Sequence, residues 1–174
     1  MRFAHDLGDG ASLVLRTLDT VDEAYELTLA NLGRLRRWEE WAQAEQTRES
    51  VASWTRRQLT EFARGAALPA LLSRHGVIVG SVGATVDPAG GRASLGYWVD
   101  AAAEGQGLVG RACRALVRSL AADGITRIEV RTVTGNERSR RVALRLGLSE
   151  SHVLPGARRI GGVVHDEVVY TLSP

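Results

Sequence analysis

The chain has 174 residues, and its 44% of hydrophobic residues supply enough apolar surface for the core of one compact domain. We therefore expect a single domain over residues 1–174. All 22 basic residues are arginine, and 20 acidic residues leave a formal net charge of +2. The absence of lysine excludes a lysine nucleophile, and so small a surplus of positive charge argues against nucleic acid as a partner.

Apolar runs, cysteines and histidines exclude further classes. The uncharged apolar runs fall well short of the roughly 20 residues that a membrane span needs. The first residues include Asp6 and lack the apolar stretch of a secretory signal. We therefore expect a cytoplasmic protein with no membrane partner. Cys113 is the only cysteine, and the four histidines are scattered along the chain, so no metal site is predicted.

The first third of the chain predicts one strand followed by helices. Ala11–Thr17 has the pattern of an opening strand. Acidic residues at Asp22 and Glu23 favour a helix start, because negative charge in a first turn complements the helix dipole. The helical spacing is interrupted at Asn31–Gly33, where we expect a break between two helices. A further helix is predicted over Ser50–Arg64.

The middle of the chain predicts an antiparallel meander. The runs Ala67–Ser73 and Val77–Asp87 are separated by three residues, which is typical of a hairpin. Pro88–Gly91 forms the next turn, and Ala93–Val99 is the third strand. These connections are too short for crossover helices, so the three strands run antiparallel.

After Val99 the pattern changes to alternating helices and strands. We predict helices over Leu108–Asp123 and Glu137–Leu146, and strands over Ile125–Thr132, Leu148–Leu154 and Val163–Leu172. The fold class is therefore α+β, with a mixed, mostly antiparallel sheet flanked by helices.

The loop Asp100–Arg111 follows a strand and opens a helix. Free N–H groups at a helix start attract phosphate, and Gly105, Gly107 and Gly110 keep side chains out of the space that a phosphate would occupy. The same glycine spacing occurs in dinucleotide-binding sheets, where it follows the first strand and an acid ends the second. Here antiparallel strands come first and the next strand ends near Arg131, so that alternative is disfavoured.

Four motifs in this order resemble the GNAT superfamily of N-acetyltransferases, and most closely its Rim-type branch. They are Gly96–Val99, Glu104–Gly107, Asn136–Ser139 and Leu146–Leu148. The branch includes enzymes that acetylate the N-terminal amines of ribosomal proteins, together with relatives that act on small amines. The resemblance implies a GNAT fold, acetyl-coenzyme A as co-substrate, and a sheet whose strands splay near Val99 so that pantetheine can pair with main-chain groups.

The resemblance also implies a set of residues that contact the cofactor. In the family's loop pattern Gly107 matches, whereas Glu104 and Val109 depart from it. We expect Glu104 to point to solvent and Arg111 to supply compensating charge. Asn136 is expected to bond to the cofactor arm, although an asparagine before a helix also serves as its N-cap. The expected cofactor contacts are Trp98, Val99, Glu104, Gly105, Gln106, Gly107, Leu108, Val109, Gly110, Arg111, Asn136 and Ser139.

Ser139 is the catalytic acid that the resemblance implies. Many family members carry a tyrosine seven residues after the asparagine, and that position here is Ala143. Ser139 lies three residues after Asn136, where Rim-type members use serine to donate a hydrogen bond to the leaving thiolate.

The general base has several candidates. Glu129 could face the cleft, but it shares a strand face with Arg127 and Arg131, so an ion pair explains it equally well. Glu39 and Glu40 are alternatives at the substrate end, and a chain of water molecules is another.

Three aromatic residues are candidates for the substrate site, and the cysteine is not. Trp38, Trp41 and Tyr97 could wall the acceptor pocket or pack on the sheet. Cys113 lies on an apolar stripe of its helix together with Leu116, which favours a core position over a covalent role.

We therefore predict an enzyme that moves the acetyl group directly from acetyl-coenzyme A to a primary amine. The acceptor is a protein N-terminal α-amine, as in ribosomal proteins, or a small-molecule amine, and a homodimer is left open. A non-catalytic acyl-coenzyme A sensor is the alternative, because Ser94, Glu104 and Ala143 replace residues that relatives use.

Overall fold

The computed structural model describes residues 4–172, which form a central eight-stranded sheet flanked by helices. The strands follow the order β1-β2-β3-β4-β5-β6-β8-β7 across the sheet. The strands are β1 (Ala4–Gly8), β2 (Ala11–Leu15), β3 (Ala67–Arg74), β4 (Val77–Asp87), β5 (Arg92–Val99), β6 (Arg127–Val133), β7 (Ser149–Ile160) and β8 (Val163–Leu172). The α-helices are α1 (Val21–Leu35), α2 (Arg48–Ala63), α3 (Leu108–Ala122) and α4 (Glu137–Arg145).

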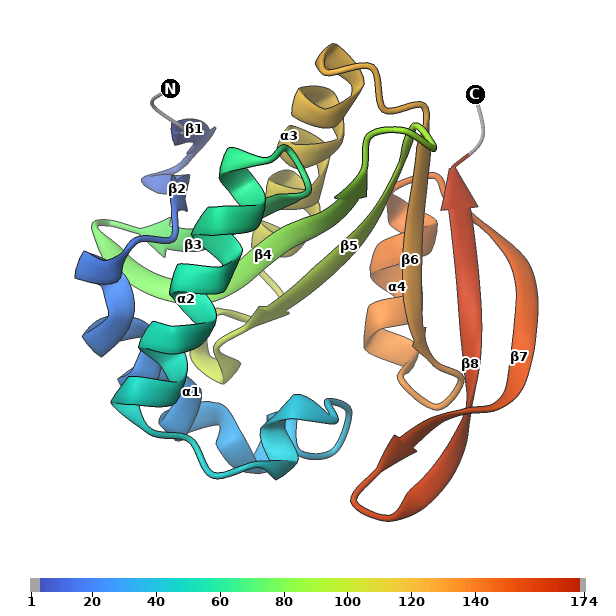
Figure 1. Cartoon of the computed structure of the whole chain (residues 1–174), viewed down its shortest axis with the longest axis horizontal. Coiled ribbons are helices and arrows are strands. Elements are labelled where there is room, and N and C mark those ends of the chain that lie inside the picture. The colour runs from blue at the N-terminus through green and yellow to red at the C-terminus, as the bar shows by residue number, and fades with distance from the viewer. Residues whose placement is uncertain (1–3, 173–174) are drawn as a thin grey trace.

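Helices cover both faces of the sheet. In Figure 1, α1 and α2 lie across one face of the β3–β5 half, and α3 lies behind it. The main core lies between the sheet and α3. It contains Leu13, Leu72 and Val82 from the strands and Leu116 from α3, all fully buried. Burying each such side chain contributes about 1.5–3 kcal/mol.

Pairing between β5 and β6 is incomplete. These two strands are the parallel pair, and their register covers Arg92–Leu95 against Arg127–Val130. Beyond Leu95 and Val130 the ladder ends and the strands diverge toward the lower part of Figure 1. Within residues 4–172, Gly96–Val99 therefore has a partner strand, β4, on only one side. This confirms the predicted α+β fold with a mixed, mostly antiparallel sheet and a splay at the end of β5.

The predicted helix break at Asn31–Gly33 is wrong, because α1 continues through Gly33 to Leu35. A glycine inside a helix costs only about 1 kcal/mol. Asn31 is 2% exposed and its amide donates to the Leu27 carbonyl and to Asp100 Oδ1. These tertiary contacts hold the last turn of the helix in place.

Two strand boundaries also differ from the prediction. β1 pairs with β2 and precedes the first predicted strand. β7 does not end at Leu154 but continues to Ile160, with an irregular register between Leu154 and Arg158. The turn to β8 is Gly161-Gly162, both with positive φ, which suits a two-residue hairpin turn. The end of β7 and the start of β8 therefore form a hairpin that projects from the sheet (Figure 1).

No helix within residues 4–172 is long and apolar enough to cross a membrane.

Candidate active site

Two clefts meet where β5 and β6 diverge. The larger has a volume of about 900 Å³ and lies between the sheet, α2 and the segment after α1. The smaller, of about 520 Å³, lies between the end of β5 and the first turns of α3 and α4. Six residues line both clefts, so the two spaces adjoin at the splay. They are Trp38, Glu39, Tyr97, Trp98, Asn136 and Ser139.

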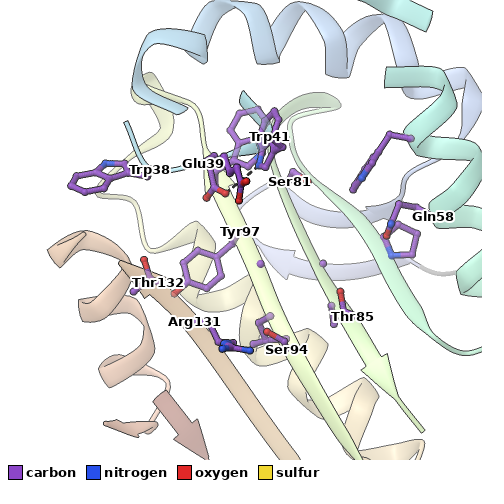
Figure 2. Close-up of a pocket in the computed structure, with 18 of the residues that line it drawn as sticks. Trp38, Glu39, Trp41, Gln58, Ser81, Thr85, Ser94, Tyr97, Arg131 and Thr132 are labelled. Carbon is purple, nitrogen blue, oxygen red and sulfur yellow. Dashed lines mark hydrogen bonds between the residues drawn. The ribbon is translucent and has the colours of Figure 1, made fainter. Parts of the chain in front are cut away.

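A pair of hydroxyl groups occupies the junction. Ser139 Oγ donates to Tyr97 Oη at 3.2 Å, and Tyr97 Oη donates to the Ser139 carbonyl at 3.0 Å. Burial raises the pKa of Tyr97 well above its usual range, so the phenol stays protonated. Tyr97 also packs against the main core, which fixes its ring. Figure 2 shows Tyr97 at the centre of the larger cleft.

Asn136 caps α4. Its Oδ1 accepts a hydrogen bond from the Ser139 amide at 3.2 Å. This contact fixes the first turn of α4 and hence the position of Ser139. The capping role proposed from the sequence is confirmed, and Asn136 also lines both clefts.

The loop before α3 fits an anionic cofactor. Gly105 and Gly107 have positive φ, and Gly107 is the N-cap of α3 without a side-chain cap. The first N–H groups of α3 are therefore left to an outside acceptor, as phosphate binding requires. Val109 lines the smaller cleft, whereas the Leu108 side chain is buried in the core and can offer only its amide.

Two expectations about charge near this loop are wrong. Glu104 does not point to solvent: its carboxylate pairs with Arg34 of α1 and with Arg138 of α4 across the smaller cleft. Arg111 does not face the loop. Its guanidinium reaches back to the β1–β2 turn, where it donates to the Leu7 carbonyl at 3.1 Å and pairs with Asp9 at 2.8 Å. In each case the charged partner comes from an element that is distant in the sequence, so the sequence alone does not reveal which guanidinium lies closest to which carboxylate.

Glu39 is the acidic residue among the six that line both clefts. It lines both clefts, and its Oε2 accepts from Trp41 Nε1 at 3.1 Å (Figure 2). Burial raises the pKa of Glu39, while the charge of Arg158 and the bond from Trp41 partly oppose that shift. Trp38 lines both clefts and Trp41 lines the larger one. Both indoles therefore form part of the cleft wall, which was one of the two alternatives predicted from the sequence.

Glu129 lines neither cleft. It forms an ion pair with Arg127 at 3.2 Å, the alternative explanation given from the sequence. Ser94, its neighbour in the β5–β6 register, lines the larger cleft instead. The geometry therefore favours Glu39 over Glu129 as a proton acceptor.

Cys113 is fully buried on the core side of α3. Burial raises the pKa of its thiol to about 12. The core position expected from the apolar stripe is confirmed.

Several residues of the larger cleft were missed by sequence reasoning. Arg131 and Arg158 both donate to Glu167, which is 4% exposed. Arg16 and Trp54 line the opposite end. These side chains come from five separate elements or their ends, so no local spacing could have grouped them.

The site combines an uncapped helix start with the diverging ends of β5 and β6, and a second cleft lies beside the first at the same place. Residues 12–149 match the model of the acetyltransferase (GNAT) domain family. The match covers well over half of the chain, and the chain belongs to this family. Membership confirms the predicted fold and the prediction of an acetyltransferase that uses acetyl-coenzyme A.

Two relatives support the Rim-type branch. YdaF of Bacillus subtilis, whose name proposes a ribosomal N-acetyltransferase, is 29% identical over 168 residues, which are 92% of this chain and 90% of the relative. The ribosomal-protein-serine acetyltransferase of Escherichia coli is 26% identical over 152 residues, which are 86% and 85% of the two chains.

Solved structures share the fold over the full length. The ribosomal L7/L12 α-N-protein acetyltransferase RimL, in complex with coenzyme A, has a TM-score of 0.95 at 22% identity, covering 98% of both chains. The microcin C7 self-immunity acetyltransferase MccE, in complex with acetyl-coenzyme A and AMP, has a TM-score of 0.91 at 24% identity, covering 97% of this chain and 94% of the other. At these identities the likeness concerns the fold alone.

Proposed function

We propose that this chain acetylates a primary amine that enters the larger cleft, with acetyl-coenzyme A entering from the smaller one. The observation that carries this proposal is the junction at the splay, where six residues line both clefts. Two co-substrates that arrive from opposite sides can react only where their spaces join. Holding both in one geometry lowers the entropic part of the barrier.

The smaller cleft offers groups suited to coenzyme A. The amides at the start of α3 suit phosphate, and the unpaired edge of Gly96–Val99 suits the amides of the pantetheine arm. Arg34, Glu104 and Arg138 together carry one net positive charge at the mouth of this cleft. When bound, the co-substrate supplies the activated acetyl group and a thiolate that leaves readily.

We assign the acid to Ser139. Its hydroxyl lies at the junction, and Tyr97 Oη holds it at 3.2 Å. The phenol has a raised pKa and donates to the Ser139 carbonyl, so both hydroxyl groups hold their protons at neutral pH. Ser139 Oγ can turn its hydrogen toward a sulfur atom in the smaller cleft, which stabilises negative charge there.

We assign the base to Glu39. The acceptor amine must lose a proton as it attacks, and Glu39 is a half-buried carboxylate that lines both clefts. The raised pKa makes it a stronger proton acceptor than an exposed glutamate. Its bond from Trp41 Nε1 fixes the carboxylate in the wall of the larger cleft.

We propose a protein N-terminal α-amine as the acceptor. Both sequence relatives carry names that refer to ribosomal acetylation. The larger cleft is bounded by the segment after α1, including Trp41 and Gln46, and on the other side by Ala157 and Arg158 of β7. A space of about 900 Å³ accommodates several residues of an extended peptide.

A thiol-release assay tests this function. The protein is mixed with acetyl-coenzyme A and a panel of amines that includes N-terminal peptides, polyamines and amino-acid derivatives. Turnover with peptides, located on the α-amine by mass spectrometry, is the expected result. Turnover restricted to small amines overturns the acceptor assignment, and coenzyme A binding without any turnover favours the sensor alternative that Ser94 and Ala143 raised.

A further inference from the structure

Arg16 is a buried cation without a counterion within residues 4–172. It follows β2 and is 6% exposed. Its Nη2 donates to Ser81 Oγ at 3.3 Å, and its guanidinium lies 4.7 Å from the centre of the Trp54 ring. Its Nε is buried and has no hydrogen-bond partner within residues 4–172. No carboxylate in that part of the chain pairs with it.

A buried, unpaired guanidinium destabilises the folded state, so a purely structural role does not explain Arg16. A buried charge without a partner loses much of its hydration free energy, and folded proteins pair buried arginine for this reason. Burial lowers the pKa of Arg16 to about 10, so it remains a cation at neutral pH. One weak hydroxyl bond and one ring face do not replace the missing anion.

The guanidinium faces the acceptor side of the molecule. Arg16, Ser81 and Trp54 all line the larger cleft. Ser81 is paired in register with Trp98, and Trp98 lines both clefts at the junction. Figure 2 shows Ser81 on the side of the cleft away from Arg131.

Other cations of this cleft are already compensated or exposed. Arg131 and Arg158 share the carboxylate of Glu167, at 2.7 and 3.2 Å. Arg57 of α2 is exposed. Arg16 therefore stands apart as a cleft-lining cation that is buried and unpaired within residues 4–172.

We propose that Arg16 binds an anionic oxygen group of the acceptor, a carboxylate or a phosphate, and so selects amines that carry negative charge. This inference rests on the proposed amine acetylation, since it assigns the far end of the same cleft. The planar guanidinium suits both oxyanions, because its N–H groups form parallel bonds to them. Trp54 holds the plane of the guanidinium in place.

Matched pairs of acceptors test the proposal on the unmodified protein. The pairs are O-phosphoethanolamine against ethanolamine, β-alanine against its amide, and tetrapeptides with Asp against Asn at each position. The charged member of at least one pair is expected to show a kcat/KM about 10- to 100-fold higher, as for a hydrogen bond to a charged group. The phosphate and carboxylate arms identify which anion is bound.

Two variants attribute the preference to Arg16. Arg16→Met keeps the apolar stem and is expected to reduce kcat/KM for the charged acceptor to the level of its neutral partner, mainly through KM. The KM for acetyl-coenzyme A should not change. Arg118→Met on α3 removes an exposed arginine outside both clefts, and this control should leave every preference intact.

Stability separates recognition from a structural role. Removing an unpaired buried charge should leave the melting temperature of Arg16→Met equal to or above that of the unmodified protein. If Arg16→Met does not fold, the matched acceptor pairs on the unmodified protein and the Arg16→Lys variant still test whether Arg16 selects charged acceptors. Neutral and charged acceptors used equally well overturn the anion site while leaving acetylation standing. Absence of thiol release with every amine overturns the proposed function itself.

Discussion

At the scale of single residues, the proposed chemistry of the site depends on two groups whose pKa values are shifted by burial. Tyr97 stays protonated and holds Ser139, while Glu39 becomes a stronger proton acceptor. Desolvation is the main cause in both, although the two groups act on opposite sides of the reaction. In the proposed mechanism, Ser139 as the acid and Glu39 as the base therefore both lie at one junction.

Glu39→Gln is expected to lower kcat about 100-fold or more, the usual contribution of a general base. Because burial raises the pKa of Glu39, the rate of the unmodified enzyme should rise with pH above the usual range of a glutamate. The variant should lose this limb of the pH–rate profile and retain only the rise from acceptor deprotonation. Steady-state kinetics between about pH 5 and 9 provide the measurement.

Glu40→Gln is the matched control for this change. Glu40 is the next residue, is exposed and lines only the larger of the two clefts, so Glu40→Gln should keep both kcat and the rise of the rate with pH that is assigned to Glu39.

The raised pKa of Glu39 also fixes the direction of its effect on the stability of the fold. A carboxyl with a raised pKa stabilises the fold below its ordinary pKa and loses that contribution as pH rises through the folded value. Glu39→Gln should therefore be no less stable at neutral pH, and a large loss of stability would point to a structural role.

The Cys113 thiol is predicted to take no part in the reaction. With a pKa of about 12 and no exposure, the thiol should resist iodoacetamide at pH 8 in the native protein and react in denaturant. Cys113→Ala should keep kcat within about twofold and lose on the order of 1 kcal/mol of stability through the small cavity. Loss of activity in a folded Cys113→Ala protein would contradict the direct-transfer mechanism.

At the scale of elements, local patterns predicted most of the strands and helices, because alternation and helical spacing reflect which face is buried. The β3–β5 meander and α3 follow from such patterns. The continuous α1 could not be predicted, since Asn31 is held by Asp100 from a distant loop. The partners of Glu104 and Arg111 were missed for the same reason: ion pairs form between elements that only the folded chain brings together.

Three elements meet at the bridge of Arg34, Glu104 and Arg138. Glu104→Gln leaves both guanidinium groups without a carboxylate at the mouth of the smaller cleft. Because coenzyme A is an anion, the KM for acetyl-coenzyme A should fall about two- to fivefold at low salt, which corresponds to the energy of an exposed ion pair. The gain should shrink at about 0.5 M salt. Glu61→Gln at the end of α2 removes a comparable pair with Arg64 away from both clefts and should change nothing. A raised KM in Glu104→Gln would mean that the bridge holds the cleft open.

At the scale of the whole molecule, the sheet consists of two parts that meet over a short stretch of parallel pairing. β1–β5 form one part, β6–β8 the other, and the ladder between them ends at Leu95 and Val130. Both clefts open at that incomplete seam. The incomplete pairing leaves one edge of β5 with unused amide groups, beside the uncapped start of α3. In this way one continuous sheet can supply a binding site in its middle.

Hydrogen exchange tests this description of the coenzyme A site without relying on catalysis. Coenzyme A at about 100 times its dissociation constant should slow exchange of the amides in residues 96–99 and 105–110 by up to about 100-fold, because bound ligand suppresses opening. Residues 149–154 at the start of β7 pair with β8 and line neither cleft, so their exchange should not change and they serve as the internal reference. Protection of residues 149–154 alone, with residues 96–99 unaffected, would place coenzyme A elsewhere and remove the basis for assigning Ser139 to the leaving thiolate.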